Sequence, residues 1–344
     1  MSAEVRTRPA APRAGSRLHG LLRARETGIA LALLIVLGAT TIPNPGFLFS
    51  SDGWRDLLLT PSILVLLAVG QAMVIITRNV DLSVGSTLGL TAYLTGRMFV
   101  DHPGLPVVVV ALIGVGAGVL LGLVNGAIVA FAKVPALVVT LGTLYAYRGI
   151  MTAWAGSTRI NASDIPQSFL SFGTSSFLTV PWLAIVSFIA LAGTAYYMRN
   201  ARGGREYYAI GSDPDAAVLY GLKVVRRTLV GFAACGGLAG LAGVLYVARY
   251  GTISSGAGTG MELQAVGAAV IGGVAIFGGS GTVLGAAIGA YLLVTINRAL
   301  PILGISDFWQ RAVVGVLIIA AIALDRILAD RQRRRLIAQR DADD

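Results

Sequence analysis

Cysteine, histidine and charged residues are all scarce in this chain of 344 residues. The single cysteine, Cys235, makes an intramolecular disulfide or a cysteine-based metal site impossible. The two histidines, His19 and His102, have no partner at ligand spacing, so no metal site is expected. Charged residues make up 13% of the chain, well below the roughly 25% of a typical soluble domain. This composition argues against a soluble globular protein.

Hydrophobic residues are abundant instead. They make up 55% of the chain, and the mean hydropathy is +0.76. They occur in continuous runs near the length of about 20 residues that crosses a bilayer as a helix, not in the alternating pattern of a membrane barrel. The sequence therefore predicts an all-α, polytopic integral membrane protein in a lipid bilayer. About ten transmembrane helices are expected, near 27–43, 57–77, 80–99, 106–132, 134–154, 177–198, 228–250, 262–279, 282–300 and 307–328.

The basic residues predict the orientation. Residues 1–26, 199–227 and 326–340 hold six Lys and Arg each, together 18 of the 27. With ten spans, all three blocks fall on the cytoplasmic side, as the positive-inside rule requires. We therefore expect both termini in the cytoplasm, with a partly disordered tail over 1–26, a transmembrane domain over 27–328 and a charged tail over 329–344. The same distribution argues against nucleic-acid binding despite the net charge of +10.

The block at 199–227 is the only long polar segment inside the chain. Asp213 and Pro214 are typical of the start of a helix, and Gly221 of its end. A short helix on a basic cytoplasmic loop predicts a docking site for a soluble partner protein.

Two further patterns concern packing. Glycines recur every fourth position at 114, 118, 122 and 126, and again at 281, 285 and 289. This spacing favours close helix–helix contact over a gating role. Ile165, Phe169 and Phe172 predict a short amphipathic helix in the polar loop 155–176.

Asp81 stands between two apolar runs, three residues after Arg78. We expect its side chain to cap the following helix at the backbone N–H groups of Ser83 and Val84, with Arg78 as an interfacial anchor or an ion partner of Asp81. A place beside a solute path is compatible with that role.

Uncharged polar side chains along the apolar runs predict the kind of solute. Asp81 and Glu262 are the only acidic residues that qualify within the spans, and both lie near span ends. An ion path more often carries several acidic groups, so a neutral polar solute is favoured. The candidate path residues are Gln71, Asp81, Ser83, Asn125, Thr140, Gln264 and Asn297.

The sequence also lacks the means to use ATP by itself. Lys133 and Lys223 are each followed by valine, so there is no phosphate-binding loop of the Gly-Lys-Ser/Thr type. No catalytic set and no cofactor site appear. Active transport would therefore draw its energy from another subunit or, alternatively, from an ion gradient in a stand-alone secondary carrier.

Taken together, several segments resemble the membrane permease subunits of carbohydrate-uptake ATP-binding-cassette (ABC) transporters, the ribose/xylose/arabinose/rhamnose family. They are TRNVDLSVGS (77–86), KVPALVVTLGTLYAYRGI (133–150), GREYYAIGSDPDAAVLYGLKV (204–224), GTGMELQAVGAAVIGGVAIFGGSGTVLGAAIGA (258–290) and FWQRAVVGVLIIAAIALDRI (308–327). Arg78-Asn79-Val80 stand where many members have Gly-Gly-Ile, which is similar to the rhamnose-type and autoinducer-2-type branches.

This resemblance implies a non-enzymatic transport subunit of a prokaryotic inner membrane. It implies a dimer with a second permease, two cytoplasmic ABC ATPase subunits and an extracytoplasmic sugar-binding protein. It places a coupling helix within 212–222, with Arg205, Glu206, Asp213, Asp215, Tyr220 and Gly221 as the expected ATPase contacts. Rhamnose or a related sugar is the favoured solute; autoinducer-2, ribose, xylose or a nucleoside are alternatives.

Overall fold

The computed structural model describes residues 25–309 and the positions 312–313, 315–316, 319–320 and 323. The helices are α2 (Arg25–Thr41), α3 (Gly46–Phe49), α4 (Ser51–Leu59), α5 (Ser62–Ile76), α6 (Val84–Asp101), α7 (Val107–Ala132), α8 (Ala136–Ala155), α9 (Gln167–Thr174), α10 (Trp182–Asn200), α11 (Arg202–Ser212), α12 (Pro214–Leu219), α13 (Val224–Tyr250), α14 (Met261–Ile271) and α15 (Val283–Ile302). Two 3-10 turns (Ala162–Asp164 and Asp307–Trp309) and one antiparallel hairpin, β1 (Ser176–Phe177) and β2 (Val180–Pro181), complete the described part.

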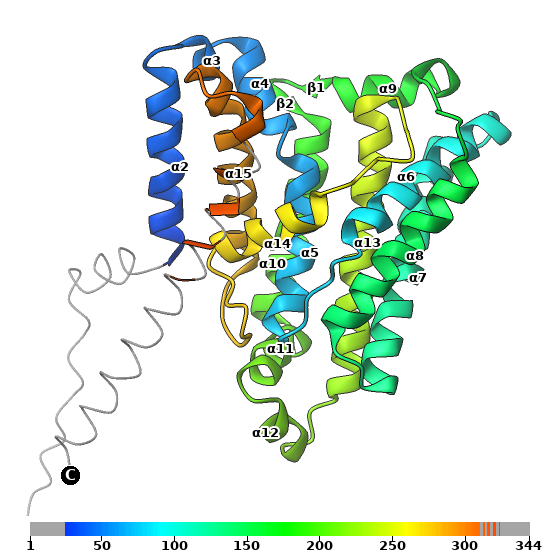
Figure 1. Cartoon of the computed structure of the whole chain (residues 1–344), viewed down its shortest axis with the longest axis vertical. Coiled ribbons are helices and arrows are strands. Elements are labelled where there is room, and N and C mark those ends of the chain that lie inside the picture. Colours follow the sequence, from blue (N-terminus) through cyan, green and yellow to red (C-terminus); the bar gives the residue numbers. More distant parts are fainter. Residues whose placement is uncertain (1–24, 310–311, 314, 317–318, 321–322, 324–344) are drawn as a thin grey trace, which may run out of the picture.

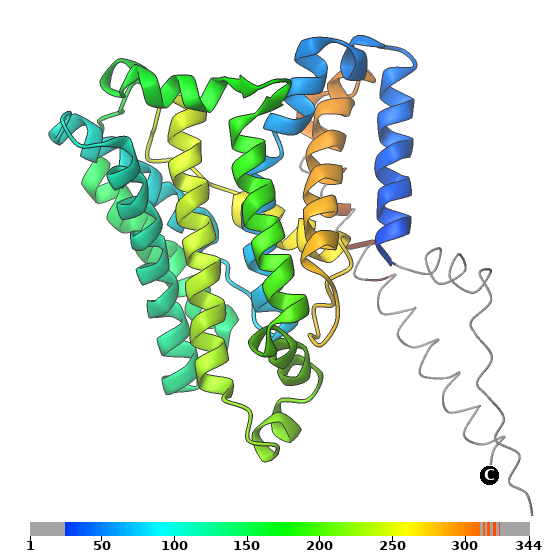
Figure 2. The ribbon, with the colours of Figure 1, turned by 180° about the vertical axis from the view of Figure 1, so that it is seen from behind.

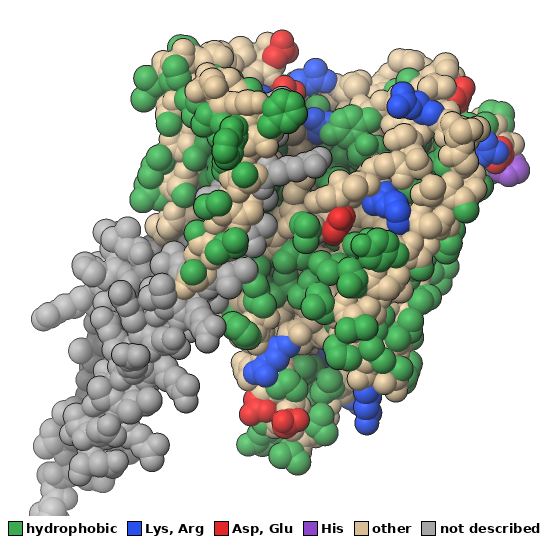
Figure 3. Space-filling model, viewed as in Figure 1, with side chains coloured by type: hydrophobic (Ala, Val, Ile, Leu, Met, Phe, Trp, Pro, Cys, Tyr) green, Lys and Arg blue, Asp and Glu red, His purple; other side chains and the backbone are tan. Residues whose placement is uncertain are grey.

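The centre of this helical bundle is formed by α5 and α13. Helix α13 packs along α7, α6 and α5, while α14 and α15 cover another side of α5. Every residue of α5 is buried, as expected for a helix that is apolar all round. Figures 1 and 2 show the long helices running between two ends, one with α3, α4, α9 and the hairpin, the other with α11 and α12. Hydrophobic side chains cover much of the surface between these ends (Figure 3).

Glycines allow α7 and α13 to touch through their backbones. A Cβ atom on Gly118 would lie 2.3 Å from the carbonyl oxygen of Gly236, and one on Gly122 would lie 2.2 Å from that of Phe232. Gly126 also faces α13, where its Cβ atom would lie 3.2 Å from the Cα of Leu229, whereas Gly114 faces the side chains of Val244 on α13 and Thr95 on α6. The predicted packing role of the first glycine series is therefore confirmed.

The second glycine series does the same between α15 and α14. A Cβ atom on Gly285 would lie 2.2 Å from the carbonyl oxygen of Gly272, and one on Gly289 would lie 2.1 Å from that of Ala268. Gly281, in the preceding loop, has φ +122° and lies against Val274. Small residues thus bring α14 close to α15, although α14 is short.

Six helical stretches among the described residues are long and apolar enough to cross a membrane: Ser51–Ile76, Val107–Ala132, Ala136–Ala155, Trp182–Asn200, Val224–Tyr250 and Val283–Ile302. The expected count of about ten is not confirmed. The apolar part of α2 is shorter, and α6 ends in the ion pair Arg97–Asp101 (2.6 Å). The predicted span 307–328 lies largely outside the described residues.

The predicted span 262–279 is wrong as a continuous helix. Helix α14 ends at Ile271, and turns follow up to the start of α15. Gly273, Gly278, Gly279 and Gly281 all adopt positive φ, which a helix does not tolerate and glycine allows. Figure 1 shows α14 near mid-height of the bundle, with the turns descending toward α11.

The amphipathic helix expected in loop 155–176 is confirmed as α9. Ile165 and Phe169 are buried, and the Phe169 ring packs on Phe99 with ring centroids 5.1 Å apart. Residues 1–24 and 324–344 lie outside the described part, so the orientation of both termini stays a prediction.

Candidate functional site: a buried polar network and an exposed helical loop

A hydrogen-bonded network surrounds Asp81 in the connection between α5 and α6. Asp81 is 1% exposed. Its Oδ1 accepts from the backbone N of Ser83 (2.9 Å), the hydroxyl of Ser83 (2.7 Å) and Nδ2 of Asn125 on α7 (3.5 Å). An aspartate that bonds the backbone two residues ahead forms a local turn, and α6 begins directly after it. The predicted bond to the backbone N of Ser83 is present, but Ser83 and not Asp81 is the N-cap residue of α6, and Asp81 forms no bond to Val84. The prediction that Asp81 caps this helix is therefore wrong.

Other helices complete the network. Gln71 of α5 donates to the carbonyl oxygen of Asp81. Thr140 of α8 donates to the carbonyl oxygen of Val80 (3.1 Å), and Nδ2 of Asn125 donates to the hydroxyl of Ser83 (2.8 Å). The network therefore ties the α5–α6 connection to α5, α7 and α8.

Five of the seven predicted path residues meet in this network: Gln71, Asp81, Ser83, Asn125 and Thr140. All five are buried, at 0–1% exposure, and they bond with each other and with the backbone. Gln264 on α14 and Asn297 on α15 are half-buried and do not join it. In this conformation the network therefore links helices through buried hydrogen bonds and does not line an open solute cavity.

Tyr147 also belongs to the network, although it was not among the predicted path residues. Its hydroxyl lies 3.0 Å from the carbonyl oxygen of Leu121 and 3.4 Å from Oδ1 of Asn125. Tyr147 follows Thr140 by two helical turns on α8, so the two share one helix face. That spacing is the signal that identifies it.

Arg78 does not pair with Asp81, and the proposed ion pair is wrong. Its Nε donates to the carbonyl oxygen of Gly211 (2.6 Å) and its Nη2 to that of Ser212 (2.6 Å), both at the end of α11. The buried carboxylate is satisfied by neutral donors, which leaves the guanidinium free to bind elsewhere.

A second polar group surrounds the start of α14. Arg148 of α8 donates to the carbonyl oxygen of Ala257 (2.5 Å), and Oε1 of Glu262 accepts from the backbone N of Gly260 (3.1 Å). Oε2 of Glu262 is buried and has no hydrogen-bond partner among the described residues. Glu262 is in the first turn of α14, the helix that lies near mid-height of the bundle in Figure 1.

Two glycines on α6 make room for this group. A Cβ atom on Gly85 would lie 2.1 Å from Oε2 of Glu262, and one on Gly89 would lie 2.4 Å from the carbonyl oxygen of Ala257. Arg148 and Glu262 are both half-buried and attract each other. Because charge at membrane depth is costly, these two residues mark a place that lipid does not cover.

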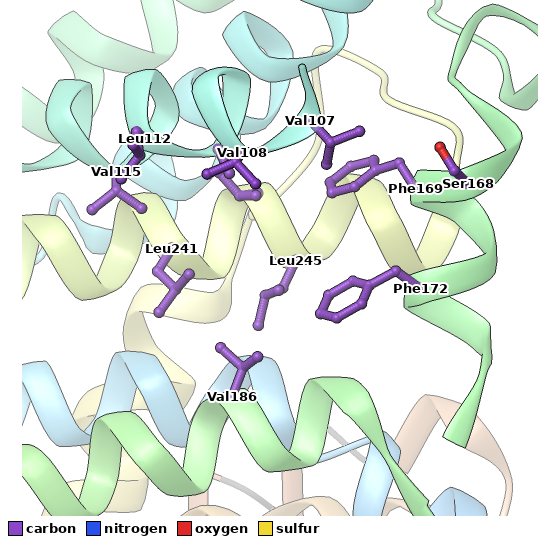
Figure 4. Close-up of a pocket in the computed structure, with 12 residues that line it drawn as sticks. Val107, Val108, Leu112, Val115, Ser168, Phe169, Phe172, Val186, Leu241 and Leu245 are labelled. Atoms are coloured by element: carbon purple, nitrogen blue, oxygen red, sulfur yellow. The ribbon is translucent and has the colours of Figure 1, made fainter. Parts of the chain in front are cut away.

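A cavity of about 480 Å³ lies between α7, α9, α10 and α13. Figure 4 shows side chains from all four helices pointing toward it, among them Val108, Phe172, Val186 and Leu245. Among the described residues that line it, Ser168 supplies the only polar side chain. A neutral polar solute needs hydrogen-bonding groups, so this cavity is not a candidate for its path.

The loop 199–227 contains two helices, α11 and α12, where the sequence predicted one. Asp213 caps α12 by accepting from the backbone N of Ala216 (2.9 Å), and Gly221 (φ +73°) follows its end. Both predicted helix boundaries are confirmed. Helix α12 projects from the end of the molecule (Figure 2) and exposes three large apolar residues, Val218 (62%), Leu219 (86%) and Tyr220 (86%).

The remaining expected contacts around α12 differ in exposure. Arg205, Asp213 and Asp215 are exposed. Glu206 turns inward instead, because its carboxylate accepts from Nε of Arg227 (2.7 Å) and Nε of Arg202 (3.2 Å). The hydrogen bond from Arg227 and the attraction of both guanidinium groups lower the pKa of Glu206 below its ordinary value.

A basic pocket of about 290 Å³ adjoins α12. Its charged lining consists of Arg202, Lys223, Arg226 and Arg227 against the single carboxylate of Glu206. This end of the molecule therefore exposes the apolar residues Val218, Leu219 and Tyr220 beside a basic pocket.

Comparison with known proteins decides the class of the chain. Residues 55–322 match the family described as "Branched-chain amino acid transport system / permease component". The chain belongs to this permease family. It is therefore a transport subunit and a multi-pass protein of the bacterial inner membrane, as its apolar helices and the sequence resemblance indicated.

Full-length relatives support this. The Autoinducer 2 import system permease protein LsrC of Enterobacter sp. (strain 638) is 36% identical over 307 residues, which cover 89% of this chain and 88% of that protein. The LsrC protein of Escherichia coli (strain K12 / DH10B) is 35% identical over 318 residues, 91% of this chain and 90% of that protein. The Salmonella typhimurium (strain LT2) protein of the same name is 36% identical over 280 residues, 81% of this chain and 80% of that protein. No solved structure matches the chain.

Proposed function

We propose that this permease is the membrane subunit of an ATP-driven importer that carries a small, neutral, polyhydroxylated solute into the cell. The observation that carries the proposal is α12, a short capped helix with an exposed apolar tip on a chain that has no phosphate-binding loop of its own. Such a helix fits a groove on a soluble ATPase, and its apolar side chains would make the contact.

The mechanism is alternating access. Two permease copies, or this chain and a paralogue, form the path, and an ATPase subunit docks on each α12. ATP binding closes the ATPases and moves the α12 helices, which opens the path outward to an extracytoplasmic binding protein. Hydrolysis returns the path to its inward-facing state. No bond of the solute is made or broken in this chain.

The solute path includes polar side chains that lie outside the Asp81 network and are unsuited to contact with lipid. Glu262 and Arg148 offer a carboxylate acceptor and a forked donor, a combination that hydrogen-bonds neighbouring hydroxyl groups of a sugar. Gln264 follows on α14, and Asn297 has a buried Oδ1 without a described partner. Asp81 and its neighbours act by holding α5, α7 and α8 around this path.

Autoinducer-2 is the favoured solute, because LsrC proteins match nearly the whole length of the chain. The variant Arg78-Asn79-Val80 is similar to the rhamnose-type branch as well, and rhamnose is the second candidate. Both are neutral and polar. The carboxylate of Glu262 and the guanidinium of Arg148 have opposite charges and attract each other, so this pair gives the proposed path no net charge.

Reconstituted uptake tests the proposed function. The chain, its ATPase subunit and its binding protein, identified from neighbouring genes, are placed in proteoliposomes and supplied with radiolabelled autoinducer-2 or rhamnose. Accumulation of autoinducer-2 that requires internal ATP and survives an ionophore is expected. Uptake by this chain alone, abolished by the ionophore, would establish the ion-coupled carrier instead.

The tip of α12 is expected to be essential for docking. Leu219→Glu leaves the permease folded, because the side chain is 86% exposed, but it places a charge in the apolar contact. Loss of an interface anchor costs about 2 kcal/mol or more, or roughly thirtyfold in affinity. Co-purification of the ATPase subunit and the affinity of the pair measure the effect.

Leu178→Glu is the matched control. Leu178 is 87% exposed and lies in the hairpin at the opposite end of the molecule. The control should retain ATPase binding. Equal ATPase binding by the Leu219 variant and the wild type would reject α12 as the docking helix.

A further inference from the structure

We propose that Arg78 is a positioning residue that couples α12 to the Asp81 network, so that displacement of α12 by the ATPase reaches the helices around the path. This inference rests on the proposed function. It concerns how the movement is transmitted within the chain and not which partner drives it.

The first part of this coupling is the contact of the Arg78 guanidinium with the end of α11. Arg78 has φ +64°, in the left-handed region that ends a helix. It donates from Nε and Nη2 to the last carbonyl oxygens of α11, those of Gly211 and Ser212, at 2.6 Å each. Carbonyl groups at a helix end lack intrahelical partners and carry partial negative charge. A planar guanidinium satisfies two of them at once, which a lysine ammonium does not do with the same geometry.

The second part is direct contact between backbones. The backbone N of Gly279 donates to the carbonyl oxygen of Ile76 (2.9 Å). A Cβ atom on Gly211 would lie 1.8 Å from that same oxygen, and one on Gly278 would lie 3.0 Å from it and 3.0 Å from the carbonyl oxygen of Gly211. The end of α5, the end of α11 and the turn after α14 therefore meet without side chains between them. Closely packed interiors transmit displacement in this way.

The Arg78 contact is close in sequence to α12 on one side and to the Asp81 network on the other. Ser212 is followed directly by Asp213, which caps α12. On the other side, Asp81 lies three residues after Arg78 and bonds to Asn125 of α7. Both sides are held by hydrogen bonds and not by a flexible linker. Movement of α12 therefore displaces the α5–α6 connection along with α11.

A purely structural role for Arg78 is the alternative, and the chain provides its own control. Arg249 makes an equivalent contact at the opposite end of the molecule. It donates to the carbonyl oxygen of Leu59 (2.9 Å) and to the hydroxyl of Thr60 (3.1 Å). Both arginines join distant segments at a helix end, but only Arg78 lies beside α12.

The experiment compares Arg78→Lys and Arg78→Gln with Arg249→Lys and Arg249→Gln in the complete complex of permease, ATPase subunit and binding protein. Three quantities are measured in proteoliposomes: the melting temperature, the rate of ATP hydrolysis and the amount of radiolabelled autoinducer-2 imported per ATP. The melting temperature reports the structural role that both arginines share.

We expect the variants of both arginines to lower the melting temperature by similar amounts. The Arg78 variants should also keep the ATPase bound and hydrolysing ATP, while solute imported per ATP falls about tenfold, in the range of coupling changes from single substitutions. The Arg249 variants should keep the wild-type ratio.

Three results would overturn the inference. They are an unchanged ratio in Arg78→Gln, an equal fall in the Arg249 variants, and failure of both Arg78 variants to accumulate as folded protein while the Arg249 variants do. If the wild-type complex itself showed no ATP-driven import of autoinducer-2 or rhamnose, the proposed function would fail first, and this inference with it.

Discussion

Valine in place of Gly118 is expected to separate α7 from α13 and to prevent accumulation of folded permease. The Cβ atom alone would lie 2.3 Å from the carbonyl oxygen of Gly236 and 2.7 Å from the Cα of Gly240. Overpacking costs about 1–3 kcal/mol when side chains can adjust. Here the obstacle is backbone, which moves only if the whole helix moves. The loss of stability should therefore reach at least the upper end of that range, about 3 kcal/mol. The melting temperature of the detergent-solubilised protein and its yield as a single species measure it.

Gly116→Val is the matched control on the same helix. No atom lies within 4 Å of a Cβ placed at Gly116, so valine is accommodated there and glycine's helix penalty is removed. The control should accumulate at the wild-type level or above. Equal stability of the two valine variants would show that α7 and α13 are not packed through their glycines.

Alanine in place of Asp81 is expected to have the second-largest effect. Removal of the carboxylate leaves the backbone N–H and hydroxyl of Ser83 and the amide of Asn125 without their shared acceptor. A buried donor left unsatisfied costs about 1–3 kcal/mol, and more where a charged partner is lost. We therefore expect a loss of about 3 kcal/mol or more, seen as a lower melting temperature and a lower yield from the membrane.

Asp81→Asn separates the hydrogen bonds from the charge. The asparagine Oδ1 retains the acceptor that the three donors need, so this variant should lie between the wild type and Asp81→Ala in stability. An alanine variant as stable as the wild type, with full uptake, would show that the network holds neither the fold nor the path.

Features that depend on residues close together in the sequence were predicted well. The glycines four residues apart indicated a packed helix face, and α7 and α13 touch there. Asp213, Pro214 and Gly221 indicated both ends of α12, and Phe169 and Phe172 indicated the inward face of α9, although Ile165, which belongs to the same predicted pattern, precedes that helix. In each case the spacing along the chain sets the geometry, because helix periodicity and end capping act within one or two turns.

The candidate path shows where such reasoning stops. Polarity in apolar runs selected Gln71, Asn125 and Thr140, and these do meet at Asp81. The same criterion selected Gln264 and Asn297, which lie apart from them. Polarity shows that a side chain needs a partner, but it does not say which one. The sequence left Arg78 as an interfacial anchor or an ion partner of Asp81, three residues away, whereas its guanidinium binds the carbonyl oxygens of Gly211 and Ser212.

The amino-acid sequence by itself determined that this protein is helical and membrane-embedded and that it carries a short capped helix on a polar loop, because hydropathy, charge distribution and capping residues are local properties. Only the tertiary structure decided that α14 stops at mid-height, that five polar side chains close one network, and that Arg78 joins it to α11. Those arrangements depend on which of many similar apolar helices pack together. That choice is made by backbone contacts at glycines and by hydrogen bonds between residues as far apart as Arg78 and Gly211, and spacing along the chain does not record it.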